Sequence, residues 1–205
     1  MKKNKSSKTW LIHKHKDLYF KQSKTLGYRS RSAFKLIEIN KKFKFLKKNT
    51  SLVDLGSSPG GWSQVASKEV TNGKILSIDI KEMEELNNVY FIKGDFLDDK
   101  NYQKIIDFFN NKIDVVLSDM AGNTSGNKDL DSYRTGQLCL DAMQLSTKIL
   151  SINGVFVSKI FMGSVFNEIQ INAKKCFKKF VKFKPKSSKK ESKEIYIYCK
   201  GLRQI

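Results

Sequence analysis

From residue 51 onward, short apolar runs alternate with longer amphipathic stretches, and this alternation restricts the chain to a small set of folds. Each run is rich in β-branched or aromatic residues and is bounded by Gly, Asn or Asp, which is typical of strands. The runs span residues 51–55, 74–79, 89–94, 112–119 and 154–161, and the helix-like stretches span residues 62–70, 99–111, 131–151 and 164–175. Strands that are joined by helices of this length pair in parallel.

Both ends of the chain extend this pattern. The segment "SRSAFKLIEINKKF" (30–43) begins with Ser and keeps apolar residues at helical spacing, so we expect a helix before the first strand. Residues 180–185 and 193–201 indicate two last strands around a Lys/Ser-rich loop. The predicted fold class is therefore α/β: a Rossmann-like, mostly parallel seven-stranded sheet with a C-terminal antiparallel hairpin and helices on both faces.

The charge of the chain is large and uneven. Lys and Arg number 39 against 20 Asp and Glu, which gives a formal net charge of +19. Residues 1–50 carry a net +14 and residues 174–193 a net +9, whereas residues 51–173 carry a net −5. Two cationic segments around a mildly acidic middle favour a polyanionic partner, and nucleic acid is the partner we predict. With 205 residues we expect a basic N-terminal arm at residues 1–26 and a single catalytic domain at residues 27–205.

Several classes of site are disfavoured by composition. The three cysteines are scattered without CxxC spacing, which argues against disulfides and a zinc site and suits a reducing compartment. The only histidines, His13 and His15, lie in the polar N-terminal arm, so a general base would be Lys, Asp, Glu or Tyr and no metal is expected. No apolar run has the length of a membrane span. We expect a cytoplasmic monomer away from membranes, although the Lys-rich start also resembles an organelle transit peptide.

The glycine-rich stretch "VDLGSSPGGWSQVAS" (53–67) follows the first predicted strand, at the sheet edge where such folds bind ligands. A phosphate-binding P-loop would need Lys after its last Gly, but Trp62 follows Gly61. The GxGxxG spacing of a dinucleotide site fails after Gly56. The loop therefore suits a cofactor with a small charged tail rather than a pyrophosphate.

Two acidic residues extend this predicted cofactor site. Asp79 ends the second strand, 23 residues after Gly56, where a carboxylate can accept hydrogen bonds from both hydroxyls of a ribose. Asp95 follows the third strand and can bind an adenine amino group. Ribose, adenine and a charged amino-acid tail together describe S-adenosylmethionine. The predicted cofactor contacts are Gly56, Gly60, Gly61, Trp62, Asp79, Asp95 and Asp119.

Five segments, in order along residues 9 to 201, resemble the FtsJ/RrmJ family of ribose 2′-O-methyltransferases. They are "YRSRSAFKL" (28–36), "DLGSSPGGWSQVA" (54–66), "SDMAGN" (118–123), "VSKIFMG" (157–163) and "KPKSSKKESKEIYI" (184–197). The resemblance implies S-adenosylmethionine-dependent methylation of a ribose, a uridine in the A loop of large-subunit 23S rRNA. One departure is Gly122, which stands where the family usually has Pro and loosens the loop after Asp119.

The resemblance also implies a Lys-Asp-Lys-Glu catalytic set, matched here by Lys35, Asp119, Lys159 and Glu194. Lys159 lies within the apolar strand "GVFVSKIF", where an unpaired charge is costly. It is our candidate for the proton acceptor, or for the group that orients the ribose 2′-hydroxyl while water removes the proton. Lys35 is expected to bind substrate phosphate or ribose, and Glu194 to fix the lysines.

The cationic segments are predicted to bind RNA phosphates without reading sequence. The candidate RNA-binding residues are Lys21, Lys24, Arg29, Arg31, Lys182, Lys184, Lys186, Lys189 and Lys190. Two other functions remain open: ribose methylation of a tRNA anticodon loop, and a non-catalytic RNA-binding or ribosome-assembly protein.

Overall fold

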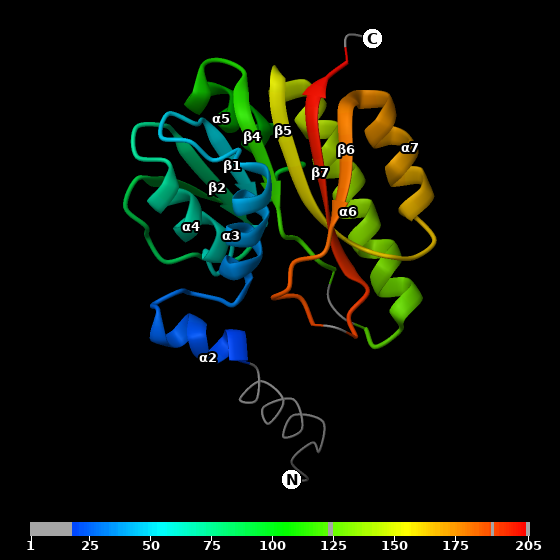
Figure 1. Cartoon of the computed structure of the whole chain (residues 1–205). Coiled ribbons are helices and arrows are strands. Elements are labelled where there is room, and N and C mark those ends of the chain that lie inside the picture. The colour runs from blue at the N-terminus through cyan, green and yellow to red at the C-terminus, as the bar shows by residue number, and fades with distance from the viewer. Residues whose placement is uncertain (1–17, 123–124, 190, 204–205) are drawn as a thin grey trace.

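The structure is a computed structural model and describes residues 18–122, 125–189 and 191–203. Its centre is a seven-stranded sheet with the order β3-β2-β1-β4-β5-β7-β6 (Figure 1). The strands are β1 Leu52–Leu55, β2 Ile75–Asp79, β3 Val89–Lys93, β4 Ile113–Ser118, β5 Leu150–Phe161, β6 Phe177–Phe183 and β7 Glu194–Leu202. The first five strands pair in parallel, and β7 runs antiparallel to both β5 and β6. The predicted fold class is confirmed.

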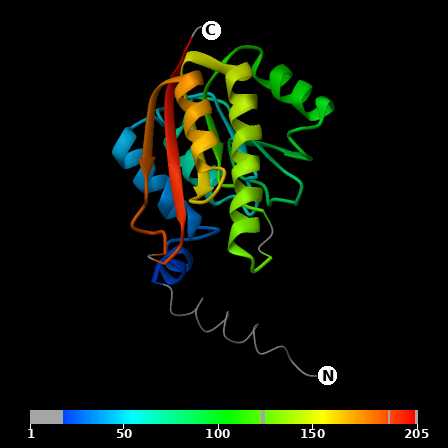
Figure 2. The same cartoon turned by 90° about the vertical axis from the view of Figure 1, so that its right-hand side faces the viewer.

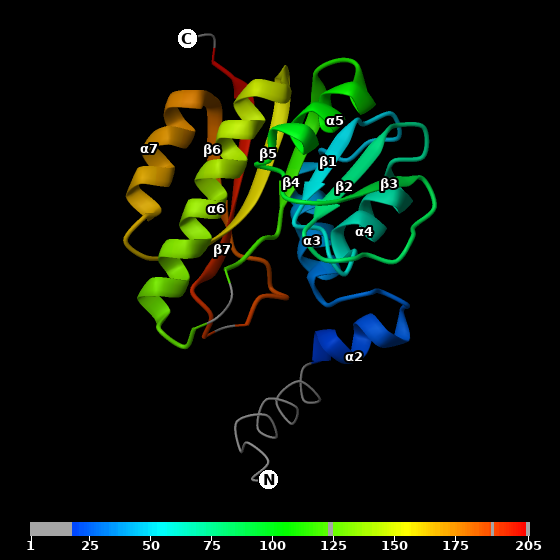
Figure 3. The same cartoon turned by 180° about the vertical axis from the view of Figure 1, so that it is seen from behind.

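Helices cover both faces of this sheet. One face carries α3 (Ser32–Phe43) and α4 (Gly61–Glu69), and the other carries α5 (Asp99–Phe109), α6 (Lys128–Ile149) and α7 (Phe166–Cys176) (Figures 1 and 3). Figure 2 shows α6 and α7 side by side in the second layer. Because side chains alternate along a strand, Val115 and Leu117 join the core under the first layer while Val116 joins the core under the second.

Several boundaries differ from the prediction; β6, for example, spans Phe177–Phe183 rather than residues 180–185. α6 begins at Lys128 rather than 131, because the Asn127 side chain accepts hydrogen bonds from the N–H groups of Asp129 and Leu130 and so caps the helix earlier. β5 begins at Leu150, four residues early, where it pairs with Ile113 across a register shift. The predicted N-terminal arm contains helix α2 (Leu18–Thr25), and residues 1–17 lie outside the described residues.

The parallel strands all end at one edge of the sheet, which we call the carboxyl edge. The glycine-rich loop joins β1 to α4 at this edge, and the loops after β2, β3 and β4 lie beside it. The parallel strands begin at the opposite end of the sheet, and the antiparallel strand β7 ends there. Within the described ranges, no helix is long and apolar enough to cross a membrane.

Candidate active site

A pocket of about 310 Å³ opens at the carboxyl edge, and four loops build it. Its walls include Gly56 and Ser58 from the glycine-rich loop, Asp79 after β2, Asp95 after β3, and Asp119 after β4; Lys159 of β5 closes one side. The structure therefore brings together three of the predicted carboxylates, one of the predicted glycines and the predicted catalytic lysine.

Gly56 brings the loop close to the end of β4. Its φ is +69°, and a Cβ atom there would lie 2.1 Å from Cγ of Met120, so only glycine fits without displacing that side chain. The Gly56 N–H donates to the carbonyl of Ile78 at 2.9 Å, which ties the loop to β2. The backbone of the glycine-rich loop at Gly56 thus forms part of the pocket wall.

Two of the three acidic residues in the pocket wall, Asp79 and Asp95, retain capacity for a ligand. The Asp79 carboxylate accepts the N–H of Ser58 at 2.9 Å and the N–H of Lys81 at 2.7 Å, one on each oxygen. Each carboxylate oxygen has a further lone pair, so both remain able to accept a hydroxyl. Asp95 accepts the N–H of Leu97 at 3.0 Å through one oxygen, which is a turn interaction, and still lines the pocket.

The other two glycines and Trp62 pack behind the pocket and are not among the residues that line it. A Cβ atom on Gly60 would lie 2.7 Å from Nη1 of Arg29, and one on Gly61 would lie 2.1 Å from Oγ of Ser30. Trp62 is 2 % exposed. These residues press the loop against the segment that precedes α3.

Asp119 and Lys159 form a buried ion pair at the pocket wall. The Lys159 Nζ lies 3.2 Å from Oδ1 of Asp119 and also donates a hydrogen bond to the Asp119 backbone carbonyl. Lys159 is 8 % exposed. It stands two residues before the end of β5, so its side chain reaches the carboxyl edge from within an otherwise apolar strand. The positive charge of Lys159, which is unusual within an apolar strand, is thus paired with a carboxylate.

Lys35 and Glu194 form a second, partly buried ion pair. The Lys35 Nζ lies 2.7 Å from Oε2 of Glu194, and the Ser188 hydroxyl donates to Oε1 of Glu194 at 2.7 Å. Lys35 comes from α3, and Glu194 begins β7 opposite Phe161 of β5. Two segments that are 159 residues apart in the chain therefore meet beside the pocket.

Tyr196 connects the two pairs and was not predicted as a site residue. Its hydroxyl donates to Oδ1 of Asp119 at 2.6 Å, and the Lys35 Nζ lies 5.7 Å from the centre of its ring. Its ring also packs 5.6 Å from that of Trp62, whose Nε1 donates to Ser32 O at 2.9 Å. Its position in the sequence could have identified it as a site residue, because Tyr196 follows Glu194 by two residues and so lies on the same face of β7.

The electrostatics of this cluster favour an ionised Asp119. Burial alone would raise the pKa of Asp119, but the Lys159 and Lys35 cations and the Tyr196 hydroxyl hold that pKa below its ordinary value. The pKa of Tyr196 is raised well above its ordinary value by burial and by the nearby carboxylates of Asp119 and Glu194. Tyr196 therefore stays a neutral hydrogen-bond donor.

A further carboxylate lies below the glycine-rich loop without a cation. Asp54 of β1 is buried; the Ser63 hydroxyl donates to Oδ2 at 2.6 Å, and Oδ1 has no hydrogen-bond partner among the described residues. Burial raises the pKa of Asp54 to about 7, against the opposing Ser63 hydrogen bond. Asp54 and Asp119 thus shift in opposite directions at the same edge.

The two arginines predicted to bind RNA form internal hydrogen bonds. Arg29 donates to the carbonyls of Glu84 at 2.6 Å and Glu85 at 2.7 Å, and more weakly to Pro59 at 3.4 Å. Arg31 donates to the carbonyl of Ser187, and burial lowers its pKa. The structure thus uses both guanidinium groups to hold loops near the candidate site.

The predicted RNA-binding lysines are exposed in two groups. Lys21 and Lys24 lie on α2. The second group, Lys182, Lys184, Lys186 and Lys189, lies on β6 and in the loop before β7, and Lys190 lies outside the described residues. That loop is attached to α3, because the Glu38 carboxylate accepts the N–H groups of Lys186 and Ser187 at 2.6 and 2.9 Å.

Known proteins of similar sequence identify the family of this chain. A family described as FtsJ-like methyltransferase matches residues 28–202. The large-subunit ribosomal RNA methyltransferase E of Pelagibacter ubique is 54 % identical over 203 residues, which cover 99 % of this chain and 100 % of that protein. The protein of the same name from Rickettsia akari is 45 % identical, over 96 % of this chain and 89 % of its own length.

Solved structures agree. A crystal structure described as a ribosomal RNA methyltransferase from Plasmodium falciparum superposes with a TM-score of 0.76 at 36 % identity, over 85 % of this chain and 98 % of that one. A methyltransferase structure from Streptococcus mutans, at 15 % identity and a TM-score of 0.54, over 84 % of this chain and 96 % of that one, shows the shared fold alone. The fold and the site define a Rossmann-like methyltransferase. Within that class, the chain belongs to the FtsJ-like methyltransferase family.

Proposed function

We propose that this protein transfers a methyl group from S-adenosylmethionine to the 2′-hydroxyl of a ribose in large-subunit ribosomal RNA, a uridine of the A loop. The observation that carries the proposal is the Asp119–Lys159 pair in the wall of the carboxyl-edge pocket, with Lys35, Glu194 and Tyr196 beside it. The relatives named as large-subunit ribosomal RNA methyltransferases support the choice of RNA. We propose further that residues 27–205 act as one catalytic domain.

The polar groups that line the pocket match the groups of the proposed cofactor. Asp79 offers two carboxylate oxygens for ribose hydroxyls, Asp95 offers an acceptor for an adenine amino group, and the backbone at Gly56 allows close approach of a charged tail. Asp119 adds an ionised carboxylate beside the reacting end. When bound, S-adenosylmethionine supplies an electrophilic methyl group on a sulfonium ion.

Lys159 is the residue that we assign to the reacting oxygen. A ribose hydroxyl is a poor nucleophile, so it must be aligned with the methyl group and must lose its proton. The Lys159 Nζ lines the pocket and is oriented by the carboxylate and the backbone carbonyl of Asp119. It can hold the oxygen in line and stabilise the negative charge that develops on it, or accept the proton at Nζ.

The second pair is assigned to the substrate side of the site. Lys35 carries a positive charge next to the pocket and can contact a ribose or phosphate oxygen of RNA. Glu194 fixes the Lys35 ammonium and is itself fixed by Ser188. Tyr196 keeps Asp119 in position through its hydroxyl.

The decisive experiment is methyl transfer from labelled S-adenosylmethionine to purified large subunits, naked large-subunit rRNA and tRNA, followed by mapping of the modified nucleotide. We expect a 2′-O-methylated uridine in the A loop. Transfer to tRNA alone would favour the tRNA enzyme. RNA binding without transfer to any substrate would favour a non-catalytic assembly protein.

The cofactor assignment has its own test at Gly56. Gly56 and Gly27 both have φ +69°, but an added Cβ meets Met120 only at Gly56, while nothing lies within 4 Å at Gly27. Gly56→Ala and Gly27→Ala therefore share the backbone cost of roughly 1 kcal/mol. In calorimetry, Gly56→Ala should lose at least tenfold affinity for S-adenosylmethionine and its demethylated product, whereas Gly27→Ala should not. Tight binding of ATP or NAD by the unmodified protein would contradict the assignment.

A further inference from the structure

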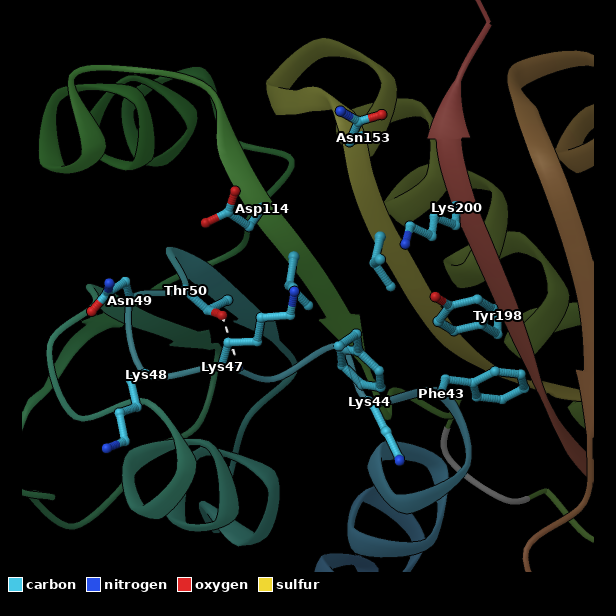
Figure 4. A pocket seen from close by; sticks show the side chains of 13 residues that line it. Phe43, Lys44, Lys47, Lys48, Asn49, Thr50, Asp114, Asn153, Tyr198 and Lys200 are labelled. Atoms are coloured by element: carbon cyan, nitrogen blue, oxygen red, sulfur yellow. Dashed lines mark hydrogen bonds between the residues drawn. The ribbon is translucent and has the colours of Figure 1, made fainter.

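A second cavity lies at the opposite end of the sheet from the candidate active site, and we call it the far pocket. It encloses about 580 Å³, compared with about 310 Å³ for the carboxyl-edge pocket. Its walls are the connector between α3 and β1, the beginnings of β4 and β5, and the end of β7 (Figure 4). Val155 in its wall and Lys159 of the carboxyl-edge pocket stand four residues apart on β5, or about 13 Å in an extended strand. A small ligand in one pocket therefore does not reach the other.

The charge of the far pocket is strongly positive. Lys44, Lys47, Lys48 and Lys200 line it, and Asp114 is the only carboxylate among its described lining residues. Figure 4 shows Lys47 and Lys200 reaching toward the opening from opposite sides. None of the four ammonium groups forms an ion pair or hydrogen bond with the parts of the chain that the structure describes.

The single carboxylate does not neutralise this cluster. Asp114 accepts the backbone N–H of Ser51 at 2.9 Å through one oxygen, which ties it to the start of β1. In Figure 4 the Lys44 and Lys48 side chains point away from the cavity, so Lys47 and Lys200 are the two charges that face each other across it. These like charges repel, and an anion between them would remove that repulsion. The arrangement therefore suits an anionic ligand with several charges.

An aromatic pair supplies one wall and a hydroxyl donor that faces the cavity. The Tyr198 ring stacks on Phe43 with 4.0 Å between ring centres and 5° between planes. Tyr198 is 3 % exposed, yet its hydroxyl has no hydrogen-bond partner among the described residues. In Figure 4 this hydroxyl points into the cavity. The hydroxyl oxygen itself is open to solvent in the cavity, and burial of the ring raises the pKa of Tyr198, so the group stays a neutral donor there.

We propose that the far pocket binds a phosphodiester segment of the RNA whose ribose is methylated at the carboxyl edge. The inference rests on the proposed function for the identity of that RNA. The ammonium groups of Lys47 and Lys200 and the Tyr198 hydroxyl are donors that face the cavity, and phosphate oxygens accept from such donors; Lys44 and Lys48 add positive charge at its rim. Because about 13 Å of strand separates the nearest walls of the two pockets, one folded RNA can occupy both, so the far pocket adds affinity and orientation without touching the reacting ribose.

The test compares two variants that lose the same charge. The pocket variant replaces Lys44, Lys47, Lys48 and Lys200 with Ala. The control variant replaces four exposed lysines away from both pockets: Lys68, Lys100, Lys104 and Lys148. Affinity for a large-subunit rRNA fragment that contains the A loop is measured over a salt series without S-adenosylmethionine. Binding of its demethylated product and thermal unfolding check that both variants are folded.

We expect the pocket variant to lose roughly 10- to 100-fold in RNA affinity and its salt slope to flatten by about 2 to 3, with less than a threefold loss in the control. Tyr198→Phe keeps the ring stack and should lose about two- to fivefold. Equal losses in the pocket and control variants would overturn the proposal. So would a pocket variant that binds naked rRNA normally but fails to bind whole large subunits, because the occupant would then be a ribosomal protein.

Methyl transfer by the unmodified protein is measured separately, so the two proposals can fail independently. If the protein methylates large-subunit rRNA while the pocket variant binds like the control, the far pocket is not an RNA site and the proposed function stands. If no RNA is methylated but the pocket variant still loses affinity selectively, the far pocket is an RNA site and the proposed function fails.

Discussion

The two ends of the sheet hold lysines in opposite states. At the carboxyl edge, Lys159 is buried and Lys35 is partly buried, and each lies within 3.2 Å of a carboxylate oxygen. At the far pocket, Lys47 and Lys200 are exposed and have no ion-pair partner within the described ranges. A buried charge is tolerated only when it is paired, so the paired end suits a site with fixed geometry. Unpaired, solvated lysines suit capture of a polyanion whose position varies.

This comparison predicts its largest effect at Lys159. Lys159→Ala should reduce the single-turnover rate by roughly two to four decades, because the group that orients the 2′-hydroxyl or takes its proton is lost. Lys159→Arg should restore little, since a guanidinium does not accept a proton near neutral pH and has a different shape. Single-turnover rates at saturating cofactor and RNA measure the chemical step apart from binding.

Lys100→Ala, at an exposed position on α5, is the matched control and should keep the full rate. A Lys159→Ala variant that retained most of the single-turnover rate would show that the buried pair is structural. The pH dependence of the same rate separates the two roles of Lys159. A rate that rises with pH to a plateau in the unmodified protein, and a Lys159→Arg variant that lacks this rise, favour proton acceptance, whereas an unchanged profile favours orientation.

The next effect concerns two buried aspartates at the carboxyl edge. Asp119 has cations nearby and a lowered pKa, so its contribution to stability is present above about pH 4 and is lost as the pH falls further. Asp54 has no cation partner and a pKa raised to about 7. The folded state therefore holds a proton on Asp54 that the unfolded chain releases above about pH 4. Its contribution to stability is present below about pH 4 and is lost as the pH rises to about 7.

Asp54→Asn should remove this dependence, because the amide keeps an acceptor for Ser63 and does not ionise. Between pH 5 and pH 7, we expect the free energy of unfolding of the unmodified protein to fall relative to the variant by about 1.4 kcal/mol per pH unit at most. Chemical denaturation at several pH values measures the difference. Parallel curves for the two proteins would mean that Asp54 is not protonated in the folded state.

The sheet could be predicted well from the sequence because each strand is marked by a pattern of neighbouring residues. Each strand is a short apolar run with polar boundaries, and the alternation with helices determines which strands are parallel. The errors lie at boundaries such as Lys128 and Leu150, where a side-chain cap and a register shift decide the residue at which an element begins. Neither feature is contained in apolar periodicity.

The candidate site was predicted unevenly. Asp119 and Lys159 follow from strand ends that meet at one edge, and the structure brings them together with Lys35 and Glu194. Tyr196 was missed because an aromatic residue in a strand is usually core. The far pocket was missed because its lysines come from a connector and from β7, which are far apart in the chain. Charge counts along the sequence do not reveal such pairings.

The smallest effect concerns Arg29, which the sequence grouped with free cations. Its guanidinium donates to the carbonyls of Glu84 and Glu85 and lies against Gly60, so it clamps the glycine-rich loop to the segment after β2. We expect Arg29→Ala to weaken binding of the demethylated cofactor about two- to fivefold, by loosening this loop, and to leave the salt slope of RNA binding unchanged. Lys24→Ala, at an exposed position on α2, should do the reverse.

Arg29→Lys distinguishes a clamp from a charge. An ammonium group keeps the charge but lacks the fork that reaches two carbonyls at once, so it should not restore cofactor affinity. Calorimetry with the demethylated cofactor and a salt series with rRNA measure the two properties on the same preparations. If Arg29→Ala flattens the salt slope and Arg29→Lys restores it, while cofactor affinity stays constant, Arg29 contacts RNA phosphate as the sequence suggested. A cation with protein partners at the carboxyl edge would then also bind RNA. The difference between paired cations at that edge and unpaired lysines at the far pocket would no longer separate catalysis from RNA binding.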